Sequence, residues 1–160
     1  MMQPDESPVA FEKSIAKGKP QVFLLCCPGN IPFSFATHPW FVVNRGAALT
    51  RWEVLFRQSA NQTSWGHLHK NFLPPFTGLG VLPYFENHFA YKATLIGYEE
   101  NEVAEQMIEI IENSPKAYPF RNKFFLTGPN SNTYASWVLN QVPGSKLKLP
   151  WNAFGKGYLR

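Results

Sequence analysis

Two short segments of the chain carry side chains that could act as a nucleophile and a base. Ser131 lies in the segment GPNSNTYASWVL (residues 128–139), which has the pattern of a helix start, and His38 precedes the apolar residues 40–43. A hydroxyl in the first turn of a helix lies near unpaired backbone N–H groups and the positive end of the helix dipole. An imidazole is a common base for such a hydroxyl. The pair could therefore support hydrolysis or acyl transfer at an amide or ester.

Both segments also have a purely structural interpretation. Asn130, Ser131, Asn132 and Thr133 are all good N-cap residues, so several of them could simply compete to begin the helix. A single histidine at the start of an apolar strand is more often structural than catalytic. The local sequence by itself favours this interpretation for the helix start.

The order of the two segments resembles that of the circularly permuted papain-like hydrolases. These include NlpC-type peptidases, lecithin:retinol acyltransferase-like enzymes and PPPDE peptidases. The run HPWFVV from His38 is similar to their H-x-apolar-apolar-V strand, and residues 130–134 are similar to their N-C-N-x-F helix start. Ser131 stands at the position of the nucleophilic cysteine. The combination of HPWFVV, RWEVL, WGHLHKN, YPFR and GPNSNTYASWVL also resembles a bacterial family of unknown function, over about residues 21 to 158.

This resemblance implies a third polar residue on the strand after the histidine strand, where it would orient the imidazole. Glu53 is the candidate, because it alternates with Trp52 and Val54. A surface glutamate paired with Arg51 or Arg57 explains the same position equally well. If the papain-like interpretation holds, the catalytic residues are Ser131, His38 and Glu53.

Other polar and aromatic residues are predicted to line the substrate cleft. His67 and His69 would share one face of a strand in WGHLHKN, which is half of a metal-binding pattern, but no third ligand is evident. We favour a role in lining the cleft and predict neither a metal site nor a cofactor. The predicted substrate-binding residues are Asn130, Asn132, His67, His69 and Trp40.

The periodicity of the chain predicts an α+β fold, with a small antiparallel sheet packed against helices. Strands are expected at residues 21–27, 36–44 and 49–57, the last two as a hairpin, with further short strands near 65–69 and 91–98. An amphipathic helix is expected at 99–113, ended by Pro115 and Pro119, and a second at 131–141. The resemblance specifies the permuted papain-like arrangement of these elements.

Domain organisation follows from length and composition. The chain has 160 residues, 44% of them hydrophobic, which suits one domain over residues 20–160 preceded by a flexible arm at 1–19. The adjacent Cys26 and Cys27 would point to opposite faces of a strand, so they predict buried thiols and no disulfide. The apolar run 22–27 is too short to cross a bilayer or to serve as a signal peptide. These features predict a cytoplasmic protein.

Charge and motifs leave three hypotheses for function. The first is a Ser131-dependent hydrolase or acyltransferase. The second is a catalytically inactive module that holds a peptide, lipid or cell-wall ligand in the same cleft. The third, binding of nucleic acid or an anionic membrane, ranks last, because the net charge is only +4 and no basic helix or nucleic-acid-binding motif is present. The sequence does not predict an oligomeric state.

Overall fold

A computed structural model describes residues 13–46, 48–82 and 89–159. Most of the expected flexible arm, residues 1–12, lies outside the described residues. The remainder of that segment contacts the sheet, since the Ala16 amide donates to Gln21 Oε1 and Asn44 Nδ2 donates to the Ala16 carbonyl. None of the helices in the described ranges is long and apolar enough to cross a membrane.

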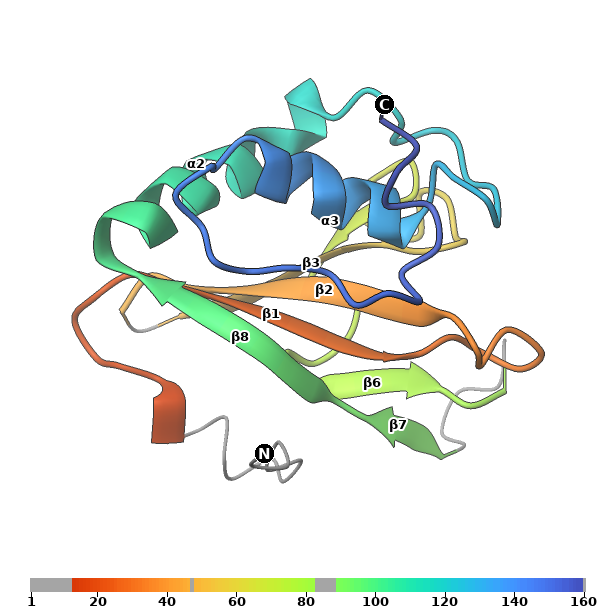
Figure 1. Ribbon diagram of the computed structural model, residues 1–160, viewed down its shortest axis with the longest axis horizontal. Helices are drawn as coiled ribbons and strands as arrows, with labels where there is room; N and C mark the ends of the chain where they lie inside the picture. Colours follow the sequence, from red (N-terminus) through yellow and green to blue (C-terminus); the bar gives the residue numbers. More distant parts are fainter. Residues whose placement is uncertain (1–12, 47, 83–88, 160) are drawn as a thin grey trace.

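The fold is mixed α+β, built on an antiparallel sheet of six strands in the order β4-β5-β3-β2-β1-β8, which confirms the predicted class (Figure 1). A separate two-stranded sheet, β6-β7, lies beneath it. The strands span Gln21–Pro28 (β1), Thr37–Asn44 (β2), Leu49–Val54 (β3), Ser64–Trp65 (β4), Leu68–Lys70 (β5), Thr77–Gly80 (β6), Ala90–Lys92 (β7) and Thr94–Glu100 (β8).

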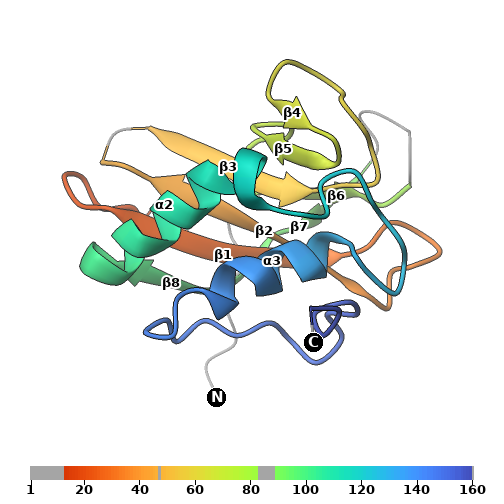
Figure 2. The same ribbon diagram turned by 90° about the horizontal axis from the view of Figure 1, so that it is seen from above.

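The main sheet is buried on both faces. Helices α2 (Asn101–Ala117) and α3 (Ser131–Asn140) cover one face, as the view from above shows (Figure 2). Their core includes Phe41 and Trp52 of the sheet with Tyr134 of α3. The opposite face packs against β6 and the residues around it, and its core includes Trp40 and Leu79. Strand β2 is therefore buried along its whole length, with apolar side chains on both sides.

Helix α2 continues four residues beyond the predicted end, so the expectation that Pro115 forbids continuation is wrong. Proline lacks the amide that would donate to the carbonyl of Ile111, four residues earlier. The hydroxyl of Ser114 donates to that carbonyl at 2.5 Å. The lost backbone bond is therefore replaced locally, and the helix ends at Ala117 with Pro115 in its last turn.

The region expected to hold one strand at 65–69 contains two strands joined by a turn at Gly66. This glycine has a φ of +64°, and its backbone lies so close to the neighbouring loop that an added Cβ would be 2.2 Å from the Arg121 carbonyl oxygen. The amide of His67 donates to the same carbonyl at 2.6 Å. The predicted strand at 91–98 is likewise divided between β7 and β8.

We predict that Gly66→Ala destabilises the domain, because an L-residue at this φ is strained and its Cβ meets backbone atoms. The free energy of unfolding should fall by about 1–3 kcal/mol, measured by urea denaturation. Gly157→Ala is the matched control, since no heavy atom lies within 4 Å of its Cβ position. Equal losses in the two variants would contradict the close approach at Gly66.

Candidate functional site

A buried network on the sheet joins two of the predicted catalytic residues. His38 Nε2 lies 2.8 Å from Glu53 Oε2. The Arg51 guanidinium donates through Nε to one Glu53 oxygen and through Nη2 to the other, both at 2.8 Å. It also donates to the carbonyls of Pro74 and Thr77 and lies 4.1 Å from the ring centroid of Trp40. Arg51 and Glu53 are fully buried.

The charge on Glu53 is stabilised by its partners. Burial by itself would raise the pKa of this carboxyl, but the positive charge of Arg51 and the hydrogen bonds from His38 and Arg51 outweigh it and bring the pKa to about 2. The carboxylate is therefore ionised at neutral pH and acts as a hydrogen-bond acceptor. It follows that His38 Nε2 carries the proton of their shared hydrogen bond.

Ser131 is not part of this network. Its side chain is buried in the first turn of α3 and forms no hydrogen bond to His38 or Glu53. His38 stacks on Trp40 and so faces the side of the sheet away from the helices, whereas α3 packs on the other side. Their neighbours are joined by a hydrogen bond, since Asn132 Nδ2 donates to the Thr37 carbonyl at 2.9 Å.

The first-turn amides of α3 are largely occupied by the helix cap. Asn130 is the N-cap residue, and its Oδ1 accepts from the amides of Asn132 and Thr133 at 3.0 and 3.3 Å. The Thr133 hydroxyl accepts from the Asn130 amide, which completes a capping box. These amides would be needed for an oxyanion hole at Ser131. The observed cap therefore occupies two of the first-turn amides, those of Asn132 and Thr133.

Asn130 and Asn132, predicted to bind substrate, hold the C-terminal segment through their side-chain amides. Both donate through Nδ2 to the Phe154 carbonyl, at 3.0 and 2.9 Å. The Thr133 hydroxyl donates to the Gly155 carbonyl. One acceptor stays unsatisfied in this part of the chain, because Asn132 Oδ1 is buried without a hydrogen-bond partner. Side-chain hydrogen bonds thus connect the start of α3 to β2 and to residues 152–155.

Two further predicted substrate-binding residues are used within the structure. Trp40 Nε1 donates to the Pro75 carbonyl at 2.8 Å. Both ring nitrogens of His69 are occupied: Nε2 bonds the Arg57 carbonyl, and Nδ1 bonds the Ser64 hydroxyl, each at 2.7 Å. The described residues contain no group of three or more His, Cys, Asp or Glu side chains that could hold a metal ion.

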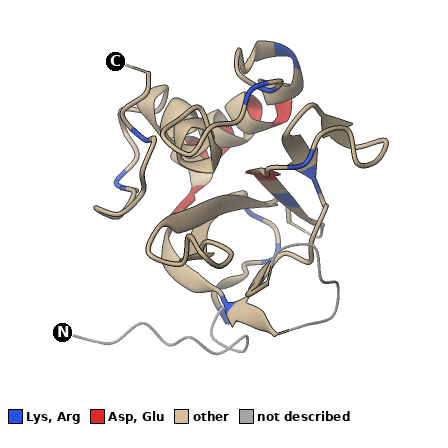
Figure 3. Ribbon diagram, turned by 90° about the vertical axis from the view of Figure 1, so that its right-hand side faces the viewer, with Lys and Arg blue, Asp and Glu red and all other residues tan. Residues whose placement is uncertain are grey.

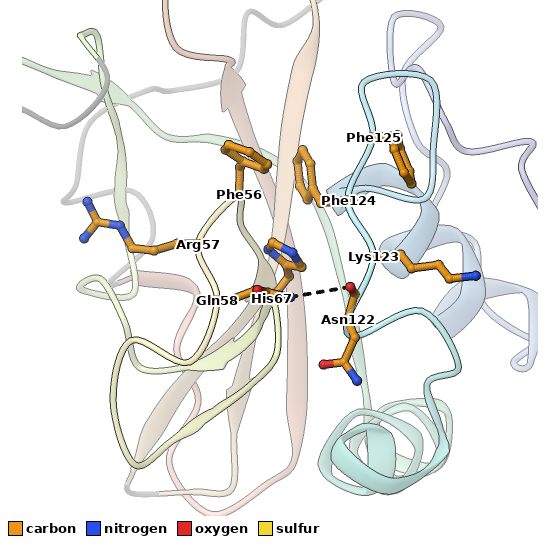
Figure 4. Close-up of a pocket in the computed structure, with 8 residues that line it drawn as sticks. All are labelled: Phe56, Arg57, Gln58, His67, Asn122, Lys123, Phe124 and Phe125. Atoms are coloured by element: carbon orange, nitrogen blue, oxygen red, sulfur yellow. Dashed lines mark hydrogen bonds between the residues drawn. The ribbon is translucent and has the colours of Figure 1, made fainter.

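His67 is the predicted substrate-binding residue that lines a pocket (Figure 4). The pocket is an open groove of about 440 Å³ between the segment after β3 and the loop before α3. His67 stacks on Phe56 with ring centroids 6.0 Å apart and packs against Phe124 at 5.6 Å. The full lining comprises Phe56, Arg57, Gln58, His67, Asn122, Lys123, Phe124 and Phe125.

The hydrogen bond between His67 and the backbone determines which of its ring nitrogens carries the proton. Nδ1 lies 2.9 Å from the Leu55 carbonyl, so Nδ1 carries the proton and Nε2 of the neutral ring is a hydrogen-bond acceptor. Burial lowers the pKa of His67, and the bond to Leu55 only partly opposes this shift. The groove therefore presents a neutral imidazole between aromatic rings. Two cations and no acid complete its lining.

Sequence reasoning did not identify several residues of these two sites. Arg51 entered only as an alternative surface partner for Glu53, although its position two residues before Glu53 puts both side chains on one face of β3. Phe56 and Phe124 had no recognisable signal. They meet only because the loop before α3 approaches the turn at Gly66.

Fold and site together define an α+β domain with a buried His–Glu–Arg network and a separate aromatic groove. The chain belongs to the DUF3750 family, described as proteins of unknown function, which matches residues 28–158. Searches of curated proteins and of solved structures returned no significant match.

We predict that Glu53→Gln lowers the free energy of unfolding by about 3–5 kcal/mol, because it leaves the buried Arg51 cation without its counter-charge. Urea denaturation measures the loss. Glu112→Gln is the control, since it removes the partly exposed ion pair with Arg45 and should cost about 0–1 kcal/mol. A Glu53→Gln variant as stable as Glu112→Gln would show that the network does not stabilise the fold.

Proposed function

We propose that this domain is a ligand-binding module that uses the groove around His67. The observation that supports it best is the stack of Phe56, His67 and Phe124 beside an open volume of about 440 Å³. Binding sites for small ligands commonly have this size and combine apolar walls with a few polar groups. The proposal corresponds to the catalytically inactive alternative, with the ligand site moved to a different set of residues.

The lining favours an anionic ligand with a flat or acyl apolar part. The aromatic rings offer apolar contact, and Phe125 extends this surface with 62% of its side chain exposed. Arg57 and Lys123 lie on opposite sides of the groove and their side chains extend away from His67 (Figure 4), so they make the rim of the groove positive. Neutral His67 can accept a hydrogen bond through Nε2. A carboxylate or sulfonate attached to an aromatic or acyl group would complement all three features.

A second candidate function is acyl transfer or hydrolysis at Ser131 within a permuted papain-like arrangement. The hydrogen bond between His38 and Glu53 favours it, because a carboxylate holds the imidazole as the third residue of a triad would. This function requires His38 Nδ1 to reach Ser131 Oγ, a contact absent from the hydrogen bonds of both residues. It also requires amides that the Asn130 cap now occupies.

We predict that the anionic fluorophore anilinonaphthalene sulfonate binds the folded domain at this groove. Phe125→Ala and Lys123→Glu should each weaken binding, the former about tenfold, equivalent to about 1.4 kcal/mol. Fluorescence titration measures the dissociation constants. Phe89→Ala is the control, because Phe89 is 87% exposed and lies outside the groove. Equal weakening in the control, or no binding to wild type, contradicts the proposal.

We predict that a fluorophosphonate probe does not label the wild-type chain, because Ser131 has no hydrogen-bonded base. Intact-protein mass spectrometry detects the adduct. Labelling of wild type and of Ser136→Ala, but not of Ser131→Ala, would overturn this expectation and support the second candidate. Ser136 is a suitable control because it lies in the same helix, more than one turn from Ser131.

A further inference from the structure

An exposed aromatic surface lies apart from both sites. It consists of Ile31, Phe33, Phe35, Trp151 and Phe154, which we call the aromatic surface. Trp151 is 82% exposed and Phe35 is 64% exposed, so these side chains contribute little to the core. The four aromatic rings of this surface form a continuous chain of contacts. The ring centroids are 6.3 Å apart for Phe33–Phe35, 6.1 Å for Phe35–Phe154 and 6.5 Å for Trp151–Phe154.

Two loops distant in sequence are held together to form this surface. The Thr37 amide donates to the Asn152 carbonyl at 3.2 Å, and the Thr37 hydroxyl donates to Asn152 Oδ1 at 2.8 Å. Asn152 Nδ2 donates to the Phe35 carbonyl. The loop after β1 and the segment near the C-terminus therefore lie side by side at one end of the sheet (Figure 1). The aromatic rings are presented outward on a fixed backbone.

Cations lie on the C-terminal segment close to Trp151. Residues 28–36 contain no charged side chain, and Lys148 and Lys156 flank Trp151 in the sequence, with Lys156 Nζ donating to the Pro150 carbonyl. Figure 3 shows basic positions on the segment leading to the C-terminus and also on strands, and it shows acidic positions on helices and strands. Exposed aromatic and aliphatic side chains next to cations match the requirements of a lipid interface that carries negative charge.

We infer that the aromatic surface docks onto an anionic lipid bilayer. Trp151, Phe35 and Ile31 would enter the headgroup region, and Lys148 and Lys156 would lie near the lipid phosphates and carboxylates. A contiguous exposed apolar patch of this kind marks an interaction surface in a folded domain. The flanking positive charge selects an anionic membrane among its potential occupants. This inference does not depend on the groove around His67.

Vesicle binding by the full chain tests the inference. The wild-type protein should co-sediment with vesicles of 30% phosphatidylserine in phosphatidylcholine, and Trp151→Ala should weaken partitioning about tenfold. Tyr98→Ala should partition as wild type does, because the 43% exposed Tyr98 lies on β8 opposite Phe23, at the end of β1 away from the aromatic surface. Lys148→Glu should reduce binding to the anionic vesicles, because the surface potential acts on nearby cations.

A spectroscopic measurement separates insertion from general adhesion. Lipids brominated near the headgroup should quench the fluorescence of Trp151, and the quenching should disappear in Trp151→Ala. Trp40 and Trp52 are buried and Trp65 and Trp137 are partly buried, so the quenching lost in Trp151→Ala is the part that Trp151 contributes. Failure of the wild type to bind anionic vesicles, equal loss in Tyr98→Ala, or self-association abolished by Trp151→Ala in sedimentation experiments would each overturn the inference.

Discussion

The ionised carboxylate of Glu53 is the interaction around which the two layers of the domain are arranged. It lies in the middle of a sheet buried on both faces, and only the combined donors of Arg51 and His38 make its charge tolerable there. Arg51 then extends to the carbonyls of Pro74 and Thr77, which connects β3 to the start of β6. The network thus fixes where the small sheet lies against the large one.

Much of the fold could be predicted from the sequence, but the orientation of its parts could not. The alternation in β3 correctly put Trp52 and Val54 opposite Glu53. The side-chain orientation of β2 could not be predicted in this way. The strand is apolar on both faces, so its pattern does not indicate which face the helices cover. His38 therefore paired with Glu53, as the third-residue interpretation requires, while facing away from α3.

Turns and helix ends escaped prediction for similarly specific reasons. Helix α2 continues through Pro115 because the Ser114 hydroxyl donates to the Ile111 carbonyl in place of the missing proline amide. Helix propensities describe single residues and do not include such a side-chain hydrogen bond. The groove depends on a close approach of Gly66 to Arg121, far away in sequence. The segment that most resembled a nucleophile site contains a complete capping box, in which the Asn130 side chain accepts from two of its amides.

The hydrogen bonds from Asn130 and Asn132 to the Phe154 carbonyl have a consequence for communication across the domain. They connect the start of α3 to the segment that carries Trp151. Displacement of the Phe154 carbonyl would remove an acceptor from both asparagine side chains, one of which caps α3 through its other atom, Oδ1. The position of the segment that carries Trp151 and the packing at the start of α3 therefore depend on the same carbonyl.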